Sequence, residues 1–486
     1  MKIAARRNAD VLIQIEEEAI ALQEWNAARS FRRPTIQTNA EQSYTDFSEP
    51  INPLTTPDHL HAGSYGVQLQ QSLFNDFLRS NVRAARENVA AEQLNSRSQE
   101  LDAMEAAGLA FLDYLAARSL WQIQKENLRI TENNLQLAKL RVQIGSVEDS
   151  ETYRWEQSAA SSRATLFQAR ADQDNARIEL NRVLGQPREK SWQFEDITLS
   201  DQDTYFMDNI LLSYLRVETD LFQFASFLQH VAVPASPELA SFDYGLAAQG
   251  ILLAQIERSF FLPELAAVLS YDRTGQGTEV LDFATQGEAL AALSFQFPLY
   301  EGGLRKAEAA EQRAVIRQLS AQRERTVQII EQRALTSMNG ISSEHPNIRL
   351  SRRALEAAEK NFESVRTKYS AGASTILDLL DAQSTLLQER QSASLAVYAY
   401  LQEIIRMQRS IAWFEHEKSS FEKDQWIRMF DQFMRGNGLI VPATVAPDQE
   451  GAEAQEKARI ALEKAVEQKE EHATLPPEPT SVATPE

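Results

Sequence analysis

The feature that most constrains this chain is an internal duplication. When Asn134 is aligned with Asn361, a shift of about 227 residues, Gly145 falls on Gly372. The expected elements repeat in the same order: a short helix, two strands, a very long helix, a glycine turn and a medium helix. The chain should therefore fold as two similar halves.

The helices of the two halves have matching lengths. In the first half we expect a short helix over 9–30, which ends before Pro34 because proline cannot continue it. The long helix over 77–144 has roughly 68 residues and would extend near 100 Å. Stacked end to end, the short and medium helices would reach nearly as far, roughly 90 Å. The second half gives similar sums, although a break at 340–346 is expected to kink or interrupt its long helix.

Apolar residues on the long helices recur every seven positions in offset rows. Two such rows predict packing against neighbours on two sides, as in a closed wall of helices. The rows are Leu128, Leu135 and Val142; Ile130, Leu137 and Ile144; and, in the second half, Leu355, Phe362 and Tyr369.

Each half also contains two segments in which polar and apolar or neutral residues alternate, as in strands with one wet and one dry face. These segments are 36–44 and 65–73, then 265–271 and 293–299. No run of about 18 apolar residues is present, so a membrane crossing would need a closed barrel of strands. Four strands cannot close a barrel, which would require several copies to share one.

Composition excludes several classes of function. The net charge of −20 argues against a nucleic-acid partner, because phosphates need a basic surface. The chain has no cysteine, which removes disulfides and thiolate sites. Neither a nucleophile elbow nor a phosphate loop appears, and the histidines do not group with acids. We therefore predict no catalytic, cofactor or metal site.

Three motifs resemble the TolC-like outer-membrane efflux family, and the resemblance covers about 8–413. The first is Tyr-Ser-Ala-Gly at 369–372 with Thr-Ile-Leu-Asp-Leu-Leu-Asp-Ala-Gln at 375–383. The second is Phe-Pro-Leu-Tyr-Glu-Gly-Gly at 297–303, similar to the family's strand-to-helix junction. The third is Leu-Asn-Arg-Val-Leu-Gly-Gln-Pro at 180–187, similar to the end of its first hairpin.

The resemblance implies a mainly α fold with β: long helical hairpins forming an α-barrel, and four strands contributed to a trimeric transmembrane β-barrel of about twelve. It implies a passive outer-membrane channel subunit of a tripartite efflux or type I secretion system. Its partners would be two further copies, a periplasmic adaptor, an inner-membrane pump and outer-membrane lipid. The channel would extend into the periplasm. Residues 1–10 do not resemble a signal peptide, so we expect a trimmed or mis-started chain.

The same reading divides the chain into five parts. The first repeat is 1–190 and a linker or equatorial insertion is 191–237. The second repeat is 238–415 and an equatorial helix is 416–440. The tail at 441–486 is rich in Ala, Glu and Pro and is expected to be disordered.

The resemblance places a periplasmic gate at the hairpin tips. Asp378 and Asp381 share a helix face, and three copies would form a ring of carboxylates that favours cations. Alternatively, Thr375 and Asp378 form a helix-start box and Asp381 is a solvated surface residue. The resemblance favours the gate for Asp381, whereas Asp378 can serve both roles.

Tyr369 and Glu151 match positions at which the family makes tip-closing contacts between hairpins. Tyr369 could equally be an ordinary core residue of the heptad row. Ser374 stands where the best-known member has an arginine, so a Glu151–arginine link cannot form. Gly145 and Gly372 are expected at the hairpin turns, where glycine tolerates a positive φ.

Other classes explain the sequence less well. A periplasmic coiled-coil adaptor would have one hairpin flanked by compact β-domains, whereas this chain has two hairpins and only paired strands. A cytoplasmic scaffold would not explain strands at equivalent points of both halves. An enzyme is the least favoured class, since no catalytic constellation appears.

Overall fold

The structure is a computed structural model that describes residues 1–46, 59–194, 218–279 and 282–436. The predicted tail at 441–486 and residues 195–217 of the predicted linker lie outside the described residues. The chain divides into two compact units, Met1–Leu199 with Leu228–Phe414, and Ser200–Phe227 with Glu415–Glu486.

The first unit contains both repeats, and its elements follow the predicted order. The first repeat consists of α1 (Ala4–Arg7), α2 (Ala9–Ser30), β1 (Thr35–Asp46), β2 (His59–Phe74), α3 (Asp76–Gln143) and α4 (Asp149–Val183). The second consists of α7 (Pro237–Arg258), β3 (Glu264–Glu279), β4 (Asp282–Gln296), α8 (Leu304–Ser370) and α9 (Ile376–Ser410). The predicted fold of long helical hairpins with four strands is confirmed.

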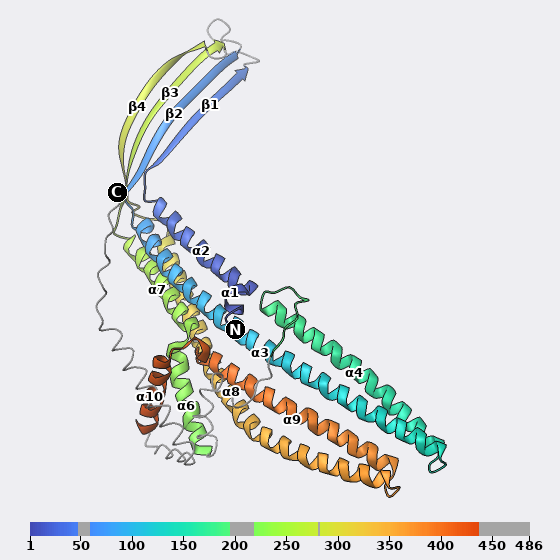
Figure 1. Cartoon of the computed structure of the whole chain (residues 1–486). Coiled ribbons are helices and arrows are strands. Elements are labelled where there is room, and N and C mark those ends of the chain that lie inside the picture. Colours follow the sequence, from blue (N-terminus) through green and yellow to red (C-terminus); the bar gives the residue numbers. More distant parts are fainter. Residues whose placement is uncertain (47–58, 195–217, 280–281, 437–486) are drawn as a thin grey trace, which may run out of the picture. The chain divides into compact units, whose positions relative to one another are not determined.

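The sheet and the helices share one lateral order (Figure 1). The strands pair antiparallel as β1-β2-β3-β4. Nearest the sheet, α3 packs between α2 and α7, and α7 packs against α8; farther away, α3 packs between α4 and α9, and α9 packs against α8. The result is a continuous wall with two unpaired edges, one at β1 and one at β4.

The strand register separates an apolar from a polar face. Ile36 pairs with Leu69, and Leu69 pairs with Leu269, which continues the apolar face across three strands. The opposite face carries Asp272 and Glu288, which also pair. The alternation predicted from the sequence is therefore present, and large apolar side chains of the first face, among them Ile36 and Leu269, are exposed in the single chain.

Two details of the strands differ from the prediction. A register shift between Ser72 and Phe74 makes Leu73 the extra residue of a bulge, and Phe74 takes the apolar position opposite Leu265. The fourth strand ends at Gln296 rather than near 299, since Pro298 has no N–H with which to continue the ladder.

The second long helix is not interrupted. Although Pro346 lies within α8, the helix continues from Leu304 to Ser370. Of the two outcomes predicted at 340–346, the interruption was therefore wrong, because packing along the wall offsets the one hydrogen bond that proline cannot make, and the kink stays a prediction.

The second unit contains a small aromatic core. It includes the start of α6 (Glu218–Ala235), a 3₁₀ turn η1 (Glu415–Glu417) and α10 (Ser420–Gly436). Phe224 and Phe227 of α6 pack against Phe430 of α10 with ring centroids 5.3 and 5.0 Å apart. The amphipathic helix predicted near 418–436 is therefore present. Among all described residues, no helix is both long and apolar enough to cross a membrane.

Candidate functional site at the hairpin tips

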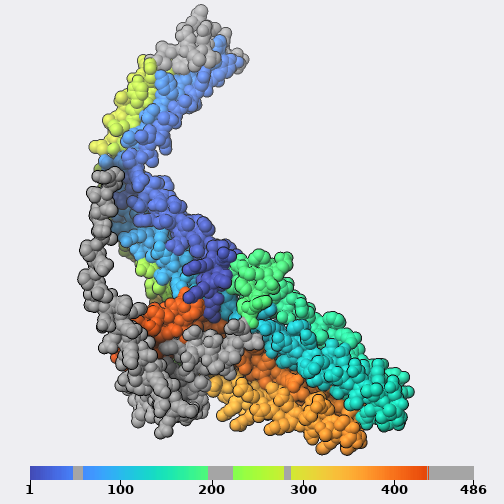
Figure 2. All heavy atoms as spheres, viewed as in Figure 1, coloured from blue at the N-terminus to red at the C-terminus, as the bar shows by residue number. Residues whose placement is uncertain are grey.

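Both helical hairpins turn on a glycine in the left-handed region. Gly145 has a φ of 74° and Gly372 a φ of 78°. After α3, the N–H of Gly145 donates to the carbonyl of Val142, and the turn after α8 repeats the pattern from Gly372 to Tyr369. These bonds satisfy carbonyls that lack a partner at the end of a helix. Glycine is favoured at both positions because it adopts the left-handed conformation without a steric penalty. Figure 2 shows both tips exposed at the surface.

The second tip begins α9 with a complete capping box. The Thr375 Oγ1 accepts from the N–H of Asp378 at 3.2 Å, and the Thr375 N–H donates to Asp378 Oδ2 at 2.9 Å. The Ser374 hydroxyl donates to the same carboxylate oxygen at 3.0 Å. The Thr375 backbone bond, followed by the two hydroxyls, holds the pKa of Asp378 below its usual range. Asp378 therefore acts at its own helix start.

The first tip uses the equivalent position differently. Glu151, which aligns with Asp378, lies in the first turn of α4, but the N-cap residue Glu148 makes no side-chain cap. Instead, the Tyr369 hydroxyl donates to Glu151 Oε2 at 2.8 Å, which links α8 to α4 and so joins the two hairpins. Arg141 adds a second link, with its guanidinium 4.7 Å from the centre of the Tyr369 ring.

Tyr369 is held in a buried setting. Burial raises the pKa of its phenol, and the hydrogen bond to Glu151 acts in the same direction. Its ring belongs to a core cluster that includes Trp155 of α4 and Leu379 of α9, both fully buried. The contact between hairpins is therefore anchored on packed apolar side chains, with one polar bond at its rim.

Asp381 lies exposed on α9, one turn beyond Asp378. In the described part of the chain, its carboxylate makes no hydrogen bond or ion pair. Arg154, the residue at the equivalent position of the first repeat, is also exposed. A single chain thus brings Glu151 and Tyr369 together but leaves Asp381 facing solvent.

A buried polar cluster above the tips escaped the sequence analysis. Gln383 of α9 donates to Asn127 Oδ1 at 3.0 Å and to Thr131 Oγ1 at 2.7 Å, and it accepts from Asn134 Nδ2 at 3.2 Å. These bonds join α9 to α3, the contact between hairpins. The sequence signal was the spacing of Asn127, Thr131 and Asn134, which puts three polar groups on one helix face.

The tips also border a shallow depression on the surface. Glu148, Glu151 and Arg154 line one side, and 375–377 line the other. The depression lies where the two hairpins meet, so any partner that fills it touches both repeats. Within the described ranges, including this depression, no group of three or more His, Cys, Asp or Glu side chains is placed to hold a metal ion.

Comparisons with known proteins agree on one family. The sequence profile described as "Outer membrane efflux protein" matches residues 2–186 and 251–412. The outer membrane efflux protein BepC of Brucella suis is 24% identical over 405 residues, which cover 81% of each chain. The outer membrane protein TolC of Escherichia coli is 24% identical over 395 residues, covering 78% of this chain and 75% of the relative.

The fold is also that of a solved channel. A crystal structure of CusC, described as a transmembrane channel, matches with a TM-score of 0.69 and 16% identity over 85% of this chain and 91% of that one. The helical wall, the amphipathic sheet and the paired tips thus define an outer-membrane export channel of the TolC-like class. The chain belongs to the outer membrane efflux protein family.

The family also fixes the location and the type of activity. The protein is a component of the outer membrane that extends into the periplasm, and the family is one of export channels rather than of enzymes. Channels of this class operate within multi-component export systems. The alternative of a periplasmic adaptor fits less well, because the matches are to channels over most of this chain.

Proposed function

We propose that three copies of this chain form one passive export duct, with energy supplied by an inner-membrane pump. The observation that carries the proposal is the wall with two open edges, in which sheet and helices share the same order. A strand edge left open in lipid would expose unpaired backbone groups, so β1 of one copy should pair with β4 of the next. The exposed apolar sheet face would then meet outer-membrane lipid.

The proposed resting gate lies at the hairpin tips. Tyr369 and Glu151 hold the two hairpins of one subunit together, and Gly145 and Gly372 shape the turns that carry them. Opening would separate the hairpins. The hydrogen bond between Tyr369 and Glu151 would be the first polar bond to break, because it lies at the rim of the buried cluster.

Asp381 is proposed to act between subunits rather than within one. Three copies related by a threefold axis would bring three Asp381 carboxylates, with Asp378 nearby, around the duct. Like charges about 10 Å apart repel by only about 0.4 kcal/mol in water, and by more where the dielectric is lower. Such a ring would favour cations over anions and could hold a multivalent cation.

The tips are also proposed to bind the periplasmic adaptor. The depression bordered by Glu151 and 375–377 joins both hairpins, so an adaptor seated there could report on or change their separation. In the proposed division of the chain, 1–190 and 238–415 form the duct, 191–237 and 416–440 form a belt, and 441–486 is a tail. No further cofactor is required for a passive conduit.

The proposal is tested with purified protein in detergent and in planar bilayers. It should run as a trimer and conduct ions; a monomer that does not conduct would refute it. Asp381→Asn should lower cation preference and block by multivalent cations, whereas Asp172→Asn, which removes an exposed carboxylate on α4, should leave both unchanged. Unchanged selectivity and block in Asp381→Asn would remove that residue from the gate.

The Tyr369–Glu151 contact has its own test in the same bilayers. Tyr369→Phe removes only the hydroxyl that bonds Glu151, and it should raise the resting conductance. Tyr153→Phe is the matched control, because Tyr153 is an exposed tyrosine near the start of α4, the helix that carries Glu151. Equal resting conductance in wild type and Tyr369→Phe would exclude this bond from the closed state.

A further inference from the structure

The apolar face of the sheet carries an arginine. Among the strand residues that the structure describes, Arg273 of β3 is the one arginine or lysine. It pairs with Tyr65 of β2 and shares its strand face with Leu269, because alternate residues of a strand point to the same side. The acids Asp272 and Glu288 lie on the other face. Charged residues on a surface that meets lipid are rare and indicate a function.

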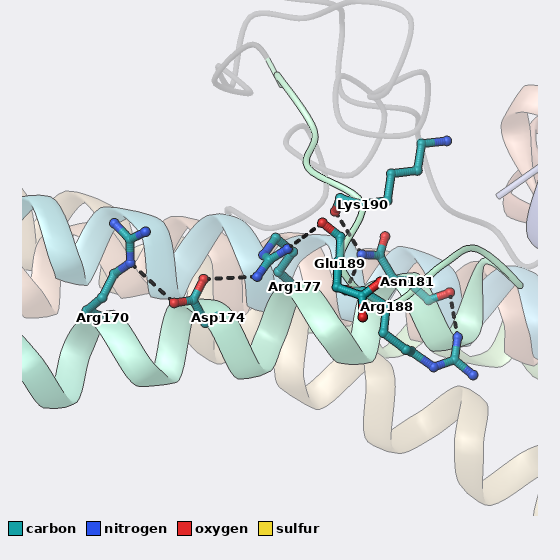
Figure 3. Close-up of polar contacts among 7 residues, drawn as sticks. All are labelled: Arg170, Asp174, Arg177, Asn181, Arg188, Glu189 and Lys190. Atoms are coloured by element: carbon teal, nitrogen blue, oxygen red, sulfur yellow. Dashed lines mark hydrogen bonds and ion pairs between the residues drawn. The ribbon is translucent and has the colours of Figure 1, made fainter.

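The surroundings of Arg273 differ from those of arginines on the helices. On α4, for example, Arg177 forms an ion pair with Asp174 of the same helix at 3.2 Å (Figure 3). The residues directly across from Arg273 are Tyr65 on β2 and Gly287 on β4. The sheet therefore places an aromatic ring and a position without a side chain, rather than a carboxylate, in the cross-strand positions beside this guanidinium.

Arg273 lies at the edge of the apolar rows that is farther from the helices. β3 follows α7, and its first apolar row is Leu265 opposite Phe295. From Leu265 to Arg273 the strand rises about 27 Å, at roughly 3.4 Å per residue. At a strand tilt of about 40° this is roughly 20 Å along the membrane normal, close to the apolar band of about 25 Å on an outer-membrane barrel. In the proposed duct, Arg273 is therefore level with the outer lipid headgroups.

Glycines leave the surface around Arg273 open, and a tyrosine hydroxyl enters the opening. Gly63 and Gly275 pair with each other in the next row outward on the same face. Across from Arg273, a Cβ built on Gly287 would lie 2.8 Å from the Tyr271 hydroxyl oxygen. That hydroxyl therefore occupies the space beside Arg273 in which another residue would have its side chain, and a ligand can approach both groups over a bare backbone.

The two polar groups suit a phosphate. The Arg273 guanidinium lies over the Tyr65 ring, 6.0 Å from its centre, and this cation–π contact orients it. A guanidinium donates two parallel N–H bonds to one phosphate, and the Tyr271 hydroxyl supplies a further donor. Both tyrosine rings are about half exposed, as is usual for rings with one apolar side and one polar end at a membrane surface.

We propose that Arg273 and the Tyr271 hydroxyl bind the phosphate of a lipid in the outer leaflet. A lipid-facing arginine is costly in the middle of the bilayer and tolerated beside the headgroups, where a phosphate can pair with it. A phosphate carried on acyl chains also covers the apolar rows below, such as that of Leu269, which a free phosphate ion cannot do. The assignment rests on the proposed duct, which turns this face toward lipid.

The test is native mass spectrometry of the purified full chain in detergent, titrated with lipid A, a phosphorylated lipid of the outer leaflet. Wild type should retain lipid A, and Arg273→Gln should bind it about tenfold more weakly, because hydrogen bonds from a charged donor are lost. Tyr271→Phe removes one neutral donor and should weaken binding about threefold. The matched control Arg33→Gln removes an exposed arginine from the turn before β1, at the opposite end of the sheet, and should bind like wild type.

Two further probes identify the group that is bound. Lipid A whose phosphates have been removed by a phosphatase should bind wild type no better than intact lipid A binds Arg273→Gln. Inorganic phosphate alone should not be retained, because it has no acyl chains to cover the apolar rows.

Several outcomes would overturn the inference. They are equal retention of lipid A by wild type and Arg273→Gln, an equal loss in Arg33→Gln, undiminished binding of the dephosphorylated lipid, and retention of inorganic phosphate. If Arg273→Gln does not assemble, which the same spectra report, Tyr271→Phe decides, and binding equal to wild type refutes the proposal. Bilayer conductance separates this inference from the proposed duct: a conducting Arg273→Gln trimer that retains lipid A like wild type contradicts only the lipid site.

Discussion

The two junctions at which a short helix meets a medium helix have the same geometry but different chemistry. In the first repeat, the start of α2 meets the end of α4 through the Asn8–Val183 bond and the close approach of Arg7 to Gly185. No charged side chain is needed, and Ala4 of α1 is buried in one cluster with Leu180 and Val183 of α4.

In the second repeat, the start of α7 meets the end of α9 through a buried arginine and two partly exposed carboxylates. Arg409, only 5% exposed, forms ion pairs with Asp102 of α3 at 2.7 Å and with Glu238 of α7 at 2.5 Å. Burial alone would raise the pKa of Glu238, but Arg409 and the Ser236 hydroxyl outweigh it and lower that pKa to about 2.

The comparison teaches that duplication preserved the backbone while the contacts diverged. At the shared offset, Arg409 aligns with Arg182, which is exposed and paired with Glu179 of its own helix, and Glu238 aligns with Val11. A buried ion cluster adds little stability over an apolar contact, but it is strongly destabilising when one partner is lost. The second junction should therefore be the more fragile to mutation.

The largest expected effect comes from breaking the charged junction. Arg409→Met leaves Asp102 and Glu238 without their cation. Because Asp102 is nearly half exposed and Glu238 only partly so, the loss in free energy of unfolding should lie at the lower end of the range for a broken buried pair, about 3 kcal/mol. Arg182→Met is the matched control and should cost less than about 1 kcal/mol. Urea unfolding of the purified proteins measures both. If both variants lost a similar amount of unfolding free energy, the proposed difference in fragility between the junctions would be wrong.

The second largest expected effect is on the pH dependence of stability, which the charged junction should make steeper in acid. The pKa of Glu238 is lowered from 4.5 to about 2 on folding, so its contribution is complete above pH 4.5 and is lost as pH falls toward 2. The contribution of Glu238 to the free energy of unfolding is roughly 3 kcal/mol. Between these pH values, wild type should lose stability more steeply than Glu238→Gln. Parallel stability–pH curves for the two proteins would contradict the lowered pKa.

The uncharged junction should be broken by a single methyl group. Gly185 has a φ of 61°, and a Cβ would lie 2.1 Å from the Arg7 carbonyl. Gly185→Ala should therefore lower the free energy of unfolding by roughly 2–3 kcal/mol. Gly145→Ala shares the positive φ but meets no atom within 4 Å, so its loss should stay near about 1 kcal/mol. Equal losses would show that the close approach is unimportant.

The smallest effect is expected in the opposite direction. Ala412, the counterpart of Gly185, has a φ of 51°, which strains a residue that carries a Cβ. Ala412→Gly should raise the free energy of unfolding by about 0.5–1 kcal/mol, because relief of strain exceeds the added entropy of the unfolded chain. Thermal unfolding can resolve this change, and a lower midpoint would mean that the junction does not strain Ala412.

Much of the fold could be predicted because it is written in local patterns. The predicted short helix over 9–30 coincides with α2, and the long helix over 77–144 differs from α3 by one residue at each end. Both are set by periodicity and by breakers such as Pro34. The interruption predicted at Pro346 does not occur, since tertiary packing decides whether a proline interrupts a helix this long.

The site was predictable only in part. The left-handed turns at Gly145 and Gly372 follow from residue type, and the Thr375–Asp378 box follows from spacing. Neither Arg409, with its two acids, nor Gln383, with its three partners, carries a local signal of burial. Their partners lie hundreds of residues away in the sequence, and only the packing of α9 against α3 brings them together.

The sequence by itself determined that the chain has two copies of one helix–strand unit, because hydrophobic period and turn residues act over a few neighbours at a time. Only the tertiary structure decided how the copies differ. The equivalent carboxylates Glu151 and Asp378 start their helices alike, yet one bonds Tyr369 across the hairpins and the other caps its own helix. That choice depends on which distant side chain lies within about 3 Å, a distance that no local pattern encodes.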